Sequence, residues 1–175
     1  MRIRAWDSVF VRARRADVHL VVADVAGWGL WWPGATSRAA DGRVALTLRP
    51  PGLIRRPQHL LVEVTENRAA KGIRMRYTGD FDGAAEWYYL DEPTGSVVHY
   101  LLDVDVADRG GRRRLVAHRA TVRAALHRLK DRLEAGRTPG SEPDPALLAH
   151  QHEALAVQER EARARARRTV APEEG

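Results

Sequence analysis

His118 is the side chain whose position in the sequence most suggests chemistry. It lies within residues 112–134, where apolar side chains recur three, four and seven positions apart, a pattern that predicts a helix with one apolar face. That face consists of Leu115, Val122, Leu126, Leu129 and Leu133. His118 shares this face and could serve as a hydrogen-bond donor or a general base near neutral pH. A histidine that only completes the core, or a helix rotated to expose it in favour of Arg119, is the simpler interpretation.

Aromatic side chains on the strands supply further polar groups. Three tyrosine hydroxyls and one indole N–H fall on positions that we expect to face the helix, among otherwise apolar residues. Such a surface is typical of a pocket that holds a hydrophobic or aromatic small molecule, although the same side chains could simply fill a core. The predicted binding residues are Trp32, Met75, Tyr77, Trp87, Tyr89, Tyr100, Leu102, His118 and Val122.

A tryptophan cluster at Trp28, Trp31 and Trp32 is the most unusual local feature. Trp28 and Trp31 are expected to be ordinary core, plugging one end of the sheet. Trp32, which precedes Pro33, is the better candidate for a residue at the mouth of a pocket.

No complete catalytic constellation is visible, and His118 is the one weak catalytic candidate. The chain has no cysteine, no glycine-rich phosphate loop and no nucleophile elbow, so we expect no metal and no cofactor. Asp103 and Asp105 form a carboxylate pair, but on the face assigned to solvent. His150 and His152 would diverge on a helix and make a poor metal pair.

The elements that must position these residues follow from hydrophobic periodicity. A spacing of three to four predicts helices at residues 16–25 and 28–32, before the long helix at 112–134. Alternation with a period of two predicts six strands, at residues 8–12, 43–49, 60–65, 73–78, 84–90 and 96–106. Short turns between the later strands indicate an antiparallel meander. The fold class is therefore α+β, with a curved sheet wrapped around the long helix.

The two aspartates of the last strand fix which of its faces is buried. Because Asp103 and Asp105 occupy odd positions, the even positions of residues 96–106 should face the core. On the preceding strand we place Trp87 and Tyr89 inward. That choice puts Glu86 on the outer face, opposite Arg74 or Arg76 of the neighbouring strand.

Composition bounds the remaining possibilities. The 175 residues fit one domain (1–136), a proline-rich linker (137–145), a charged accessory helix (146–168) and a disordered tail (169–175). The net charge of +6 is spread over most segments, which favours a solvated basic surface over a nucleic-acid site. Without a signal peptide or a stretch able to span a membrane, we expect a cytoplasmic protein. The helix at 146–168 could dock on a protein partner or on a second copy.

Three segments resemble the START-like SRPBCC superfamily, and within it bacterial proteins of the polyketide cyclase/dehydrase type. They are residues 9–34 (VFVRARRADVHLVVADVAGWGLWWPG), 79–100 (GDFDGAAEWYYLDEPTGSVVHY) and 129–137 (LKDRLEAGR). The resemblance covers about residues 5–137. It departs from the family pattern at Arg14, where a corner proline is usual, and at Ser96, where threonine is usual.

The resemblance implies a helix-grip fold, in which seven antiparallel strands wrap around the C-terminal helix and enclose a deep cavity. Two short helices would close one end, and the seventh strand would come from residues 3–6 or 35–40. The expected function is binding of a hydrophobic or aromatic, lipid- or polyketide-like molecule. Alternatives are a cyclase/aromatase-like enzyme, using Tyr77, Tyr89, Tyr100 or His118, and an interaction module based on residues 146–168.

Overall fold

A computed structural model describes residues 2–50, 56–69, 71–106, 110–134 and 160. The predicted linker (137–145) and tail (169–175) lie outside the described residues. So does the predicted accessory helix (146–168), apart from residue 160. The described structure is therefore essentially that of the domain that ends at Glu134.

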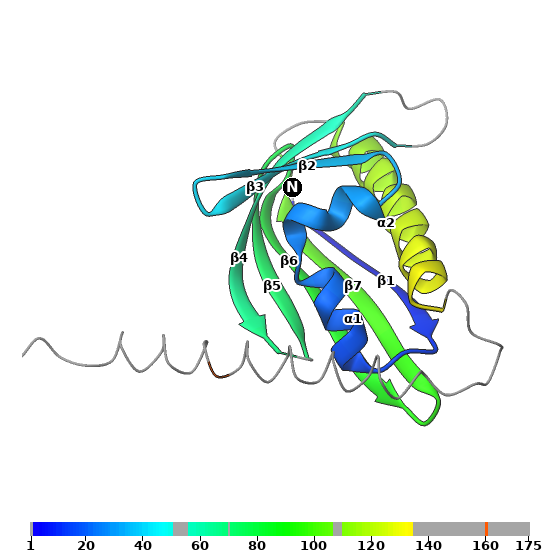
Figure 1. Ribbon diagram of the computed structural model, residues 1–175. Helices are drawn as coiled ribbons and strands as arrows, with labels where there is room; N and C mark the ends of the chain where they lie inside the picture. The colour runs from blue at the N-terminus through cyan, green and yellow to red at the C-terminus, as the bar shows by residue number, and fades with distance from the viewer. Residues whose placement is uncertain (1, 51–55, 70, 107–109, 135–159, 161–175) are drawn as a thin grey trace, which may run out of the picture.

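Seven strands and two longer helices make up this domain (Figure 1). In chain order they are β1 (Arg2–Val11), α1 (Arg15–Val22), the 3-10 helix η1 (Val25–Leu30), β2 (Ala35–Ala40), β3 (Arg43–Leu48), β4 (Gln58–Arg68), β5 (Gly72–Gly79), β6 (Asp82–Glu92), β7 (Gly95–Asp105) and α2 (Gly111–Glu134). The strands form one antiparallel sheet in the order β1-β7-β6-β5-β4-β3-β2. Strands β2 to β7 each pair with the strand next to them in the sequence, whereas β1 pairs with the last strand, β7.

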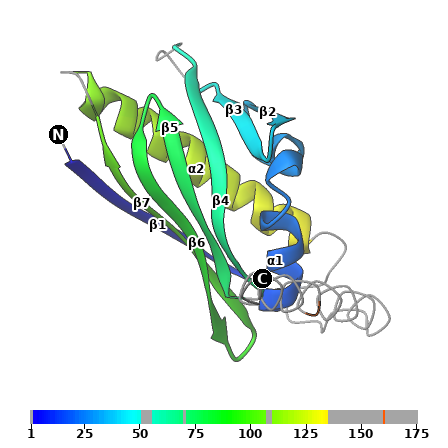
Figure 2. The ribbon, with the colours of Figure 1, turned by 90° about the vertical axis from the view of Figure 1, so that its left-hand side faces the viewer.

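The sheet curves around α2, which runs along its concave face (Figures 1 and 2). The two short helices, α1 and η1, lie near one end of α2 and of the sheet. The α+β fold class and the helix-grip arrangement are thus confirmed. The element assignments differ in detail: residues 3–6 belong to a longer β1, and residues 35–40 supply the seventh strand.

Alternation along the strands explains which face is buried. The side chains predicted to point inward are all buried: Leu46, Leu48, Leu60, Val62, Ile73, Met75, Tyr77, Trp87, Tyr89, Val98, Tyr100 and Leu102. Burial of each large apolar side chain contributes on the order of 1.5–3 kcal/mol. The assignment of Trp87 and Tyr89 to the inner face of β6 is therefore confirmed.

Tight connections keep the central strands in register. Only residues 80 and 81 separate β5 from β6. Both strands are therefore longer than predicted (73–78 and 84–90), and the turn between them is shorter. Gly83 has φ of 151°, and a Cβ atom there would come within 2.5 Å of the Asp103 carbonyl oxygen. A side chain at this position would push β6 away from β7, so that glycine is required for the pairing.

An ion-pair cluster ties α2 to the first strand. Asp7 is buried on the inner face of β1, where it accepts hydrogen bonds from Arg119 Nε at 2.9 Å and Arg123 Nε at 2.8 Å. Burial alone would raise the pKa of Asp7, but the two guanidinium groups outweigh it and lower that pKa. This clamp uses Arg119 on the side of the helix facing β1 and leaves His118 facing the sheet.

Candidate ligand-binding site

A chain of hydrogen bonds crosses the interior from β4 to β7 by way of α2. Tyr100 Oη lies 3.2 Å from Tyr77 Oη and 2.8 Å from His118 Nε2. His118 Nδ1 lies 3.1 Å from Gln58 Oε1, and Gln58 Nε2 donates to the Arg114 carbonyl oxygen at 2.8 Å. Four separate elements therefore hold one connected polar group in an apolar interior.

One order of protons satisfies every member of this chain. Because Gln58 Nε2 donates to a carbonyl, its Oε1 must accept, and His118 Nδ1 therefore carries the proton. The other ring nitrogen, Nε2, then accepts from the Tyr100 hydroxyl. The Tyr100 oxygen is left to accept from Tyr77, whose hydroxyl can rotate toward it. Gln58 thus selects the tautomer of His118.

Burial shifts the pKa values of this chain away from neutral pH. It lowers the pKa of His118 to about 3, with a small opposing effect from Asp7, and it raises the pKa values of Tyr77 and Tyr100. At neutral pH the imidazole is uncharged and both hydroxyls keep their protons. Since effective general bases have pKa values near the working pH, the chain is better suited to orienting hydrogen bonds than to removing protons.

Four tryptophans pack together beside this chain. Trp28, Trp31, Trp32 and Trp87 have ring centroids 5.3–6.2 Å apart in every pairing. Trp87 and Trp32 also contact Tyr100, at 4.9 and 6.2 Å, so the cluster joins the hydrogen-bonded chain. All of these pairs are tilted or edge-on, and edge-on contact is a favourable geometry for aromatic rings.

Several buried polar atoms, most of them in this cluster, have no hydrogen-bond partner among the described residues. Trp28 Nε1 donates to the Val22 carbonyl oxygen at 2.9 Å. By contrast, the indole N–H groups of Trp31, Trp32 and Trp87 and the hydroxyl of Tyr89 are buried without such a partner. Burial raises the pKa of Tyr89, so its hydroxyl also stays protonated. Buried polar groups are nearly always hydrogen-bonded in proteins, so this concentration of donors needs an explanation.

The predicted binding residues are all in this interior. Trp32, Met75, Tyr77, Trp87, Tyr89, Tyr100, Leu102, His118 and Val122 are each no more than 2% exposed. Tyr77, Tyr100 and His118 form the polar chain, with Trp32 and Trp87 against it. Tyr89 lies elsewhere in the core, its ring 6.0 Å from His19. Trp32, predicted at a mouth, is as buried as the rest and lies 6.4 Å from the His118 ring.

Several side chains expected to line a cavity contact one another, with aromatic centroids at 4.9–6.5 Å. One hollow lined by described residues lies on the opposite face of the sheet.

Two of the interior polar residues that escaped the sequence analysis form hydrogen bonds to α2. Gln58 stands two positions before Leu60, so extending the inward pattern backward along β4 would have placed it inside. Asp7 stands two positions before Val9, and the same step along β1 would have found it. Both were missed because the predicted strands began too late.

Two further findings concern the described part of the chain. Its histidines and carboxylates form no group of three that could hold a metal ion. Within it, no helix has the length and apolarity needed to cross a membrane.

Comparison with solved structures places this geometry among known folds. A START superfamily protein from Mycobacterium smegmatis superposes with a TM-score of 0.62 at 17% identity, over 75% of this chain and 97% of the other. The Zhui aromatase/cyclase from Streptomyces sp. R1128 gives 0.61 at 16% identity, over 79% and 100%. The di-domain aromatase/cyclase BexL, from the BE-7585A biosynthetic pathway, gives 0.59 at 18% identity, over 77% and 50%.

Sequence comparison is more specific about the family. No curated protein matches the chain significantly. A family profile described as polyketide cyclase/dehydrase and lipid transport matches residues 2–134, which is nearly the whole described domain. The chain therefore belongs to the polyketide cyclase/dehydrase and lipid transport family.

Proposed function

We propose that the domain binds a hydrophobic or aromatic small molecule bearing oxygen acceptors, between the concave face of the sheet and α2. The observation that carries this proposal is a set of buried donors that have no hydrogen-bond partner among the described residues: the indole N–H groups of Trp31, Trp32 and Trp87 and the hydroxyl of Tyr89. Each such group costs about 1–3 kcal/mol while it is unsatisfied. Carbonyl or hydroxyl oxygens on a ligand would satisfy them, and the apolar surroundings would bind its carbon skeleton.

Entry of a ligand requires some rings to move. Trp87 is fixed on β6, which pairs with a strand on each side. Trp31 and Trp32 follow η1, a short 3-10 helix held through Asp24, which accepts from Gly27 N at 3.1 Å, and through Ser37. We therefore expect the η1 segment, with Trp31 and Trp32, to move when a ligand enters. Trp87 and the Tyr100–His118 pair would form the fixed wall of the site.

Native mass spectrometry of the gently purified full chain tests the proposal first, by looking for a retained small molecule. Titration with 1,8-dihydroxyanthraquinone and, separately, oleate then gives affinities from tryptophan fluorescence. Trp87→Phe keeps the ring but removes one N–H donor, and should weaken binding of the oxygenated ring system about 2- to 10-fold. Trp6→Phe, on the outer face, is the matched control and should leave the affinity unchanged.

The proposal fails if no molecule is retained and neither probe perturbs the buried tryptophans. It also fails if Trp6→Phe abolishes the response while Trp87→Phe does not, because the probe would then bind on the outer face.

A second candidate function is a cyclase/aromatase-like enzyme, favoured by the oriented hydroxyl chain of Tyr77 and Tyr100. The Tyr77 hydroxyl, at the end of the chain, could turn its proton from Tyr100 toward a carbonyl of a reactive chain and so steer its closure. A soluble poly-β-ketone incubated with the protein should then yield aromatic product, followed by ultraviolet absorbance. Tyr100→Phe should slow this product formation, whereas a rate equal to the protein-free control would exclude the enzyme hypothesis for that substrate class.

A further inference from the structure

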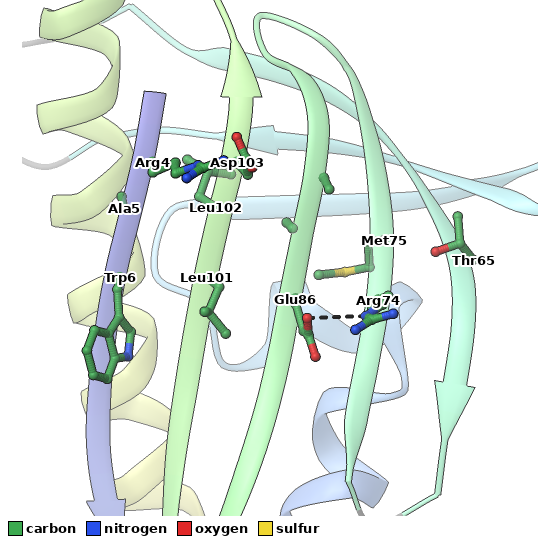
Figure 3. A pocket seen from close by; sticks show the side chains of 12 residues that line it. Arg4, Ala5, Trp6, Thr65, Arg74, Met75, Glu86, Leu101, Leu102 and Asp103 are labelled. Atoms are coloured by element: carbon green, nitrogen blue, oxygen red, sulfur yellow. Dashed lines mark hydrogen bonds and ion pairs between the residues drawn. The ribbon is translucent and has the colours of Figure 1, made fainter. Parts of the chain in front are cut away.

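A hollow of about 640 Å³ lies on the face of the sheet turned away from α2 (Figure 3). Its volume is within the range of small-molecule sites, about 300–1,000 Å³. Ala84 explains why the sheet is hollow here. Across the strands its neighbours are Asp103 on β7 and Arg76 on β5, and next along is Arg4 on β1, so one methyl group stands in a row of long side chains.

An exposed tryptophan forms one wall of this hollow. Trp6, on β1, is 62% exposed and lies opposite Leu101, which is 39% exposed. The Trp6 indole N–H donates to His99 Nδ1 at 2.9 Å, which fixes the ring in place. An aromatic ring that is both exposed and held in one orientation offers a preorganised surface for stacking.

The rim of the hollow offers hydrogen-bond donors. Arg4 follows the sheet on the same face as Trp6, two residues away, and its side chain is 75% exposed. Its Nε donates to Asp103 at 3.2 Å, but Arg2 already binds the same carboxylate at 2.6 and 2.8 Å. A guanidinium group has five N–H donors in one plane, and carboxylates match that geometry best.

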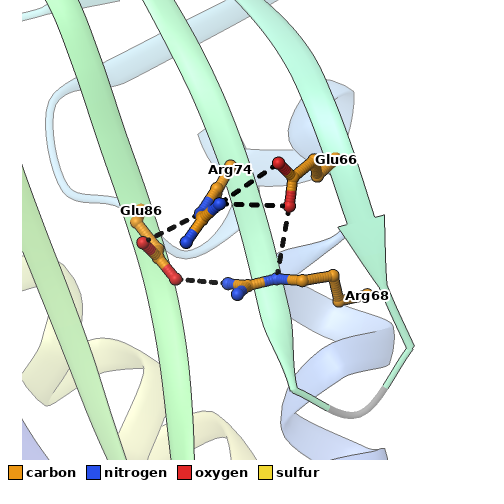
Figure 4. Close-up of polar contacts among 4 residues, drawn as sticks. All are labelled: Glu66, Arg68, Arg74 and Glu86. Atoms are coloured by element: carbon orange, nitrogen blue, oxygen red, sulfur yellow. Dashed lines mark hydrogen bonds and ion pairs between the residues drawn. The ribbon is translucent and has the colours of Figure 1, made fainter.

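The opposite rim is closed by a separate ion-pair network. Arg74 donates to both Glu66 and Glu86, and Arg68 binds the same two carboxylates (Figure 4). These carboxylates are therefore already engaged by arginines and have little capacity to accept from a ligand. A ligand must bring its own acceptor. Of the two arginines that line the hollow, Arg4 makes the fewer hydrogen bonds to described residues, one against three for Arg74.

We propose that this outer hollow is a second binding site, for a flat aromatic carboxylate. The ring would lie over Ala84 against Trp6 and Leu101, and the carboxylate would bind the guanidinium of Arg4. The site is independent of the interior one, because the side chains concerned point to the other face of the same strands.

Fluorine NMR of protein labelled with 5-fluorotryptophan tests this directly, because the chain has five tryptophans and Trp6→Phe assigns the outer one. Titration with 2-naphthoate should shift the Trp6 signal and leave the four others unchanged. Neutral 2-naphthol, and 2-naphthoate with Arg4→Met, should each bind about tenfold more weakly. Ala84→Leu should fill the hollow and abolish the shift. Thr78→Leu, on the same outer face beyond the hollow, is the matched control and should leave the Trp6 shift unchanged.

Three outcomes would overturn the proposal. Shifts of the buried tryptophans alone would mean that naphthoate enters the interior. Broadening of Trp6 with protein concentration, without any probe, would mean that a second copy covers this face. A Trp6 signal that stays unchanged up to the solubility limit of naphthoate, in a protein whose other signals show it folded, would mean that the hollow binds no such molecule.

Discussion

The two faces of strand β6 carry polar groups in opposite ways. On the inner face, Trp87 and Tyr89 are buried with a polar atom each that no described residue satisfies. On the outer face, Glu86 is bound by Arg68 and Arg74 at once. Inside, polar atoms are few and costly, so each is informative about a ligand. Outside, polar groups are many and most of them bond to one another, although His99 Nε2 and Arg68 Nε have no hydrogen-bond partner among the described residues. On that face the informative feature is the hollow between the long side chains.

The outer face is nevertheless ordered. Arg68 lies over the Tyr88 ring at 6.0 Å, Tyr88 stacks on His99 at 6.3 Å, and His99 accepts from Trp6. The row takes one residue from each of four strands, β4, β6, β7 and β1, and positions Trp6 beside the hollow. Both faces are therefore ordered, and we expect them to differ in how much their side chains contribute to the free energy of unfolding. Substitutions on each face can measure that difference.

The largest difference should come from removing a ring on each face. Trp87→Ala leaves a cavity in the four-tryptophan cluster and should lower the free energy of unfolding by about 3–5 kcal/mol. Trp6→Thr, which keeps a strand-forming residue at an exposed position, should change it by about 0.5 kcal/mol or less. Urea unfolding followed by circular dichroism measures both. Equal losses would mean that the faces do not differ in packing.

Acid should destabilise the protein through its interior histidine. Burial lowers the pKa of His118 to about 3, so the unfolded chain takes up a proton near pH 6.5 that the folded state refuses. Stability is then fully present above pH 6.5 and falls as pH drops toward the folded pKa. The expected loss is about 2 kcal/mol between pH 7.5 and 5.

His118→Gln should remove that part of the pH dependence, measured as urea midpoints at several pH values. The slope that remains belongs to other histidines, since burial also lowers the pKa values of His19 and His99. A pH dependence unchanged in His118→Gln would show that His118 is protonated as easily in the folded as in the unfolded state.

The next largest loss of stability should come from breaking the ion-pair cluster of Asp7, Arg119 and Arg123 between β1 and α2. Asp7→Asn removes the charge that Arg119 and Arg123 share, and should cost about 1–3 kcal/mol. The loss is limited because both arginines are partly exposed and can return to water. Asp82→Asn, at an exposed outer position paired with Arg76 at 3.9 Å, is the control and should be neutral within about 0.5 kcal/mol. Thermal unfolding followed by calorimetry would rank the two.

Periodicity was sufficient to predict the sheet faces because one misplaced residue would move every side chain of a strand to the other face. It assigned Trp87, Tyr89 and Glu86 correctly, and Arg74 is indeed the partner of Glu86. It could not predict which tryptophan rings contact one another in the interior, because that depends on how the segment around η1 packs against β6. The outer hollow was equally hidden, since Ala84 is informative only when its neighbours on other strands are known.

The smallest effect should come from the ion pair between Arg68 and Glu86, whose side chains are 27% and 23% exposed. A double-mutant cycle with Arg68→Gln and Glu86→Gln isolates the pair from the bond that Glu86 also makes to Arg74. Because both groups retain contact with water, the coupling free energy should be about 0.5 kcal/mol. It should shrink further at about 1 M salt, where the screening length is about 3 Å. A coupling above about 2 kcal/mol that salt does not reduce would mean that this face is held as tightly as the interior, and the contrast between the faces would then be one of chemistry alone.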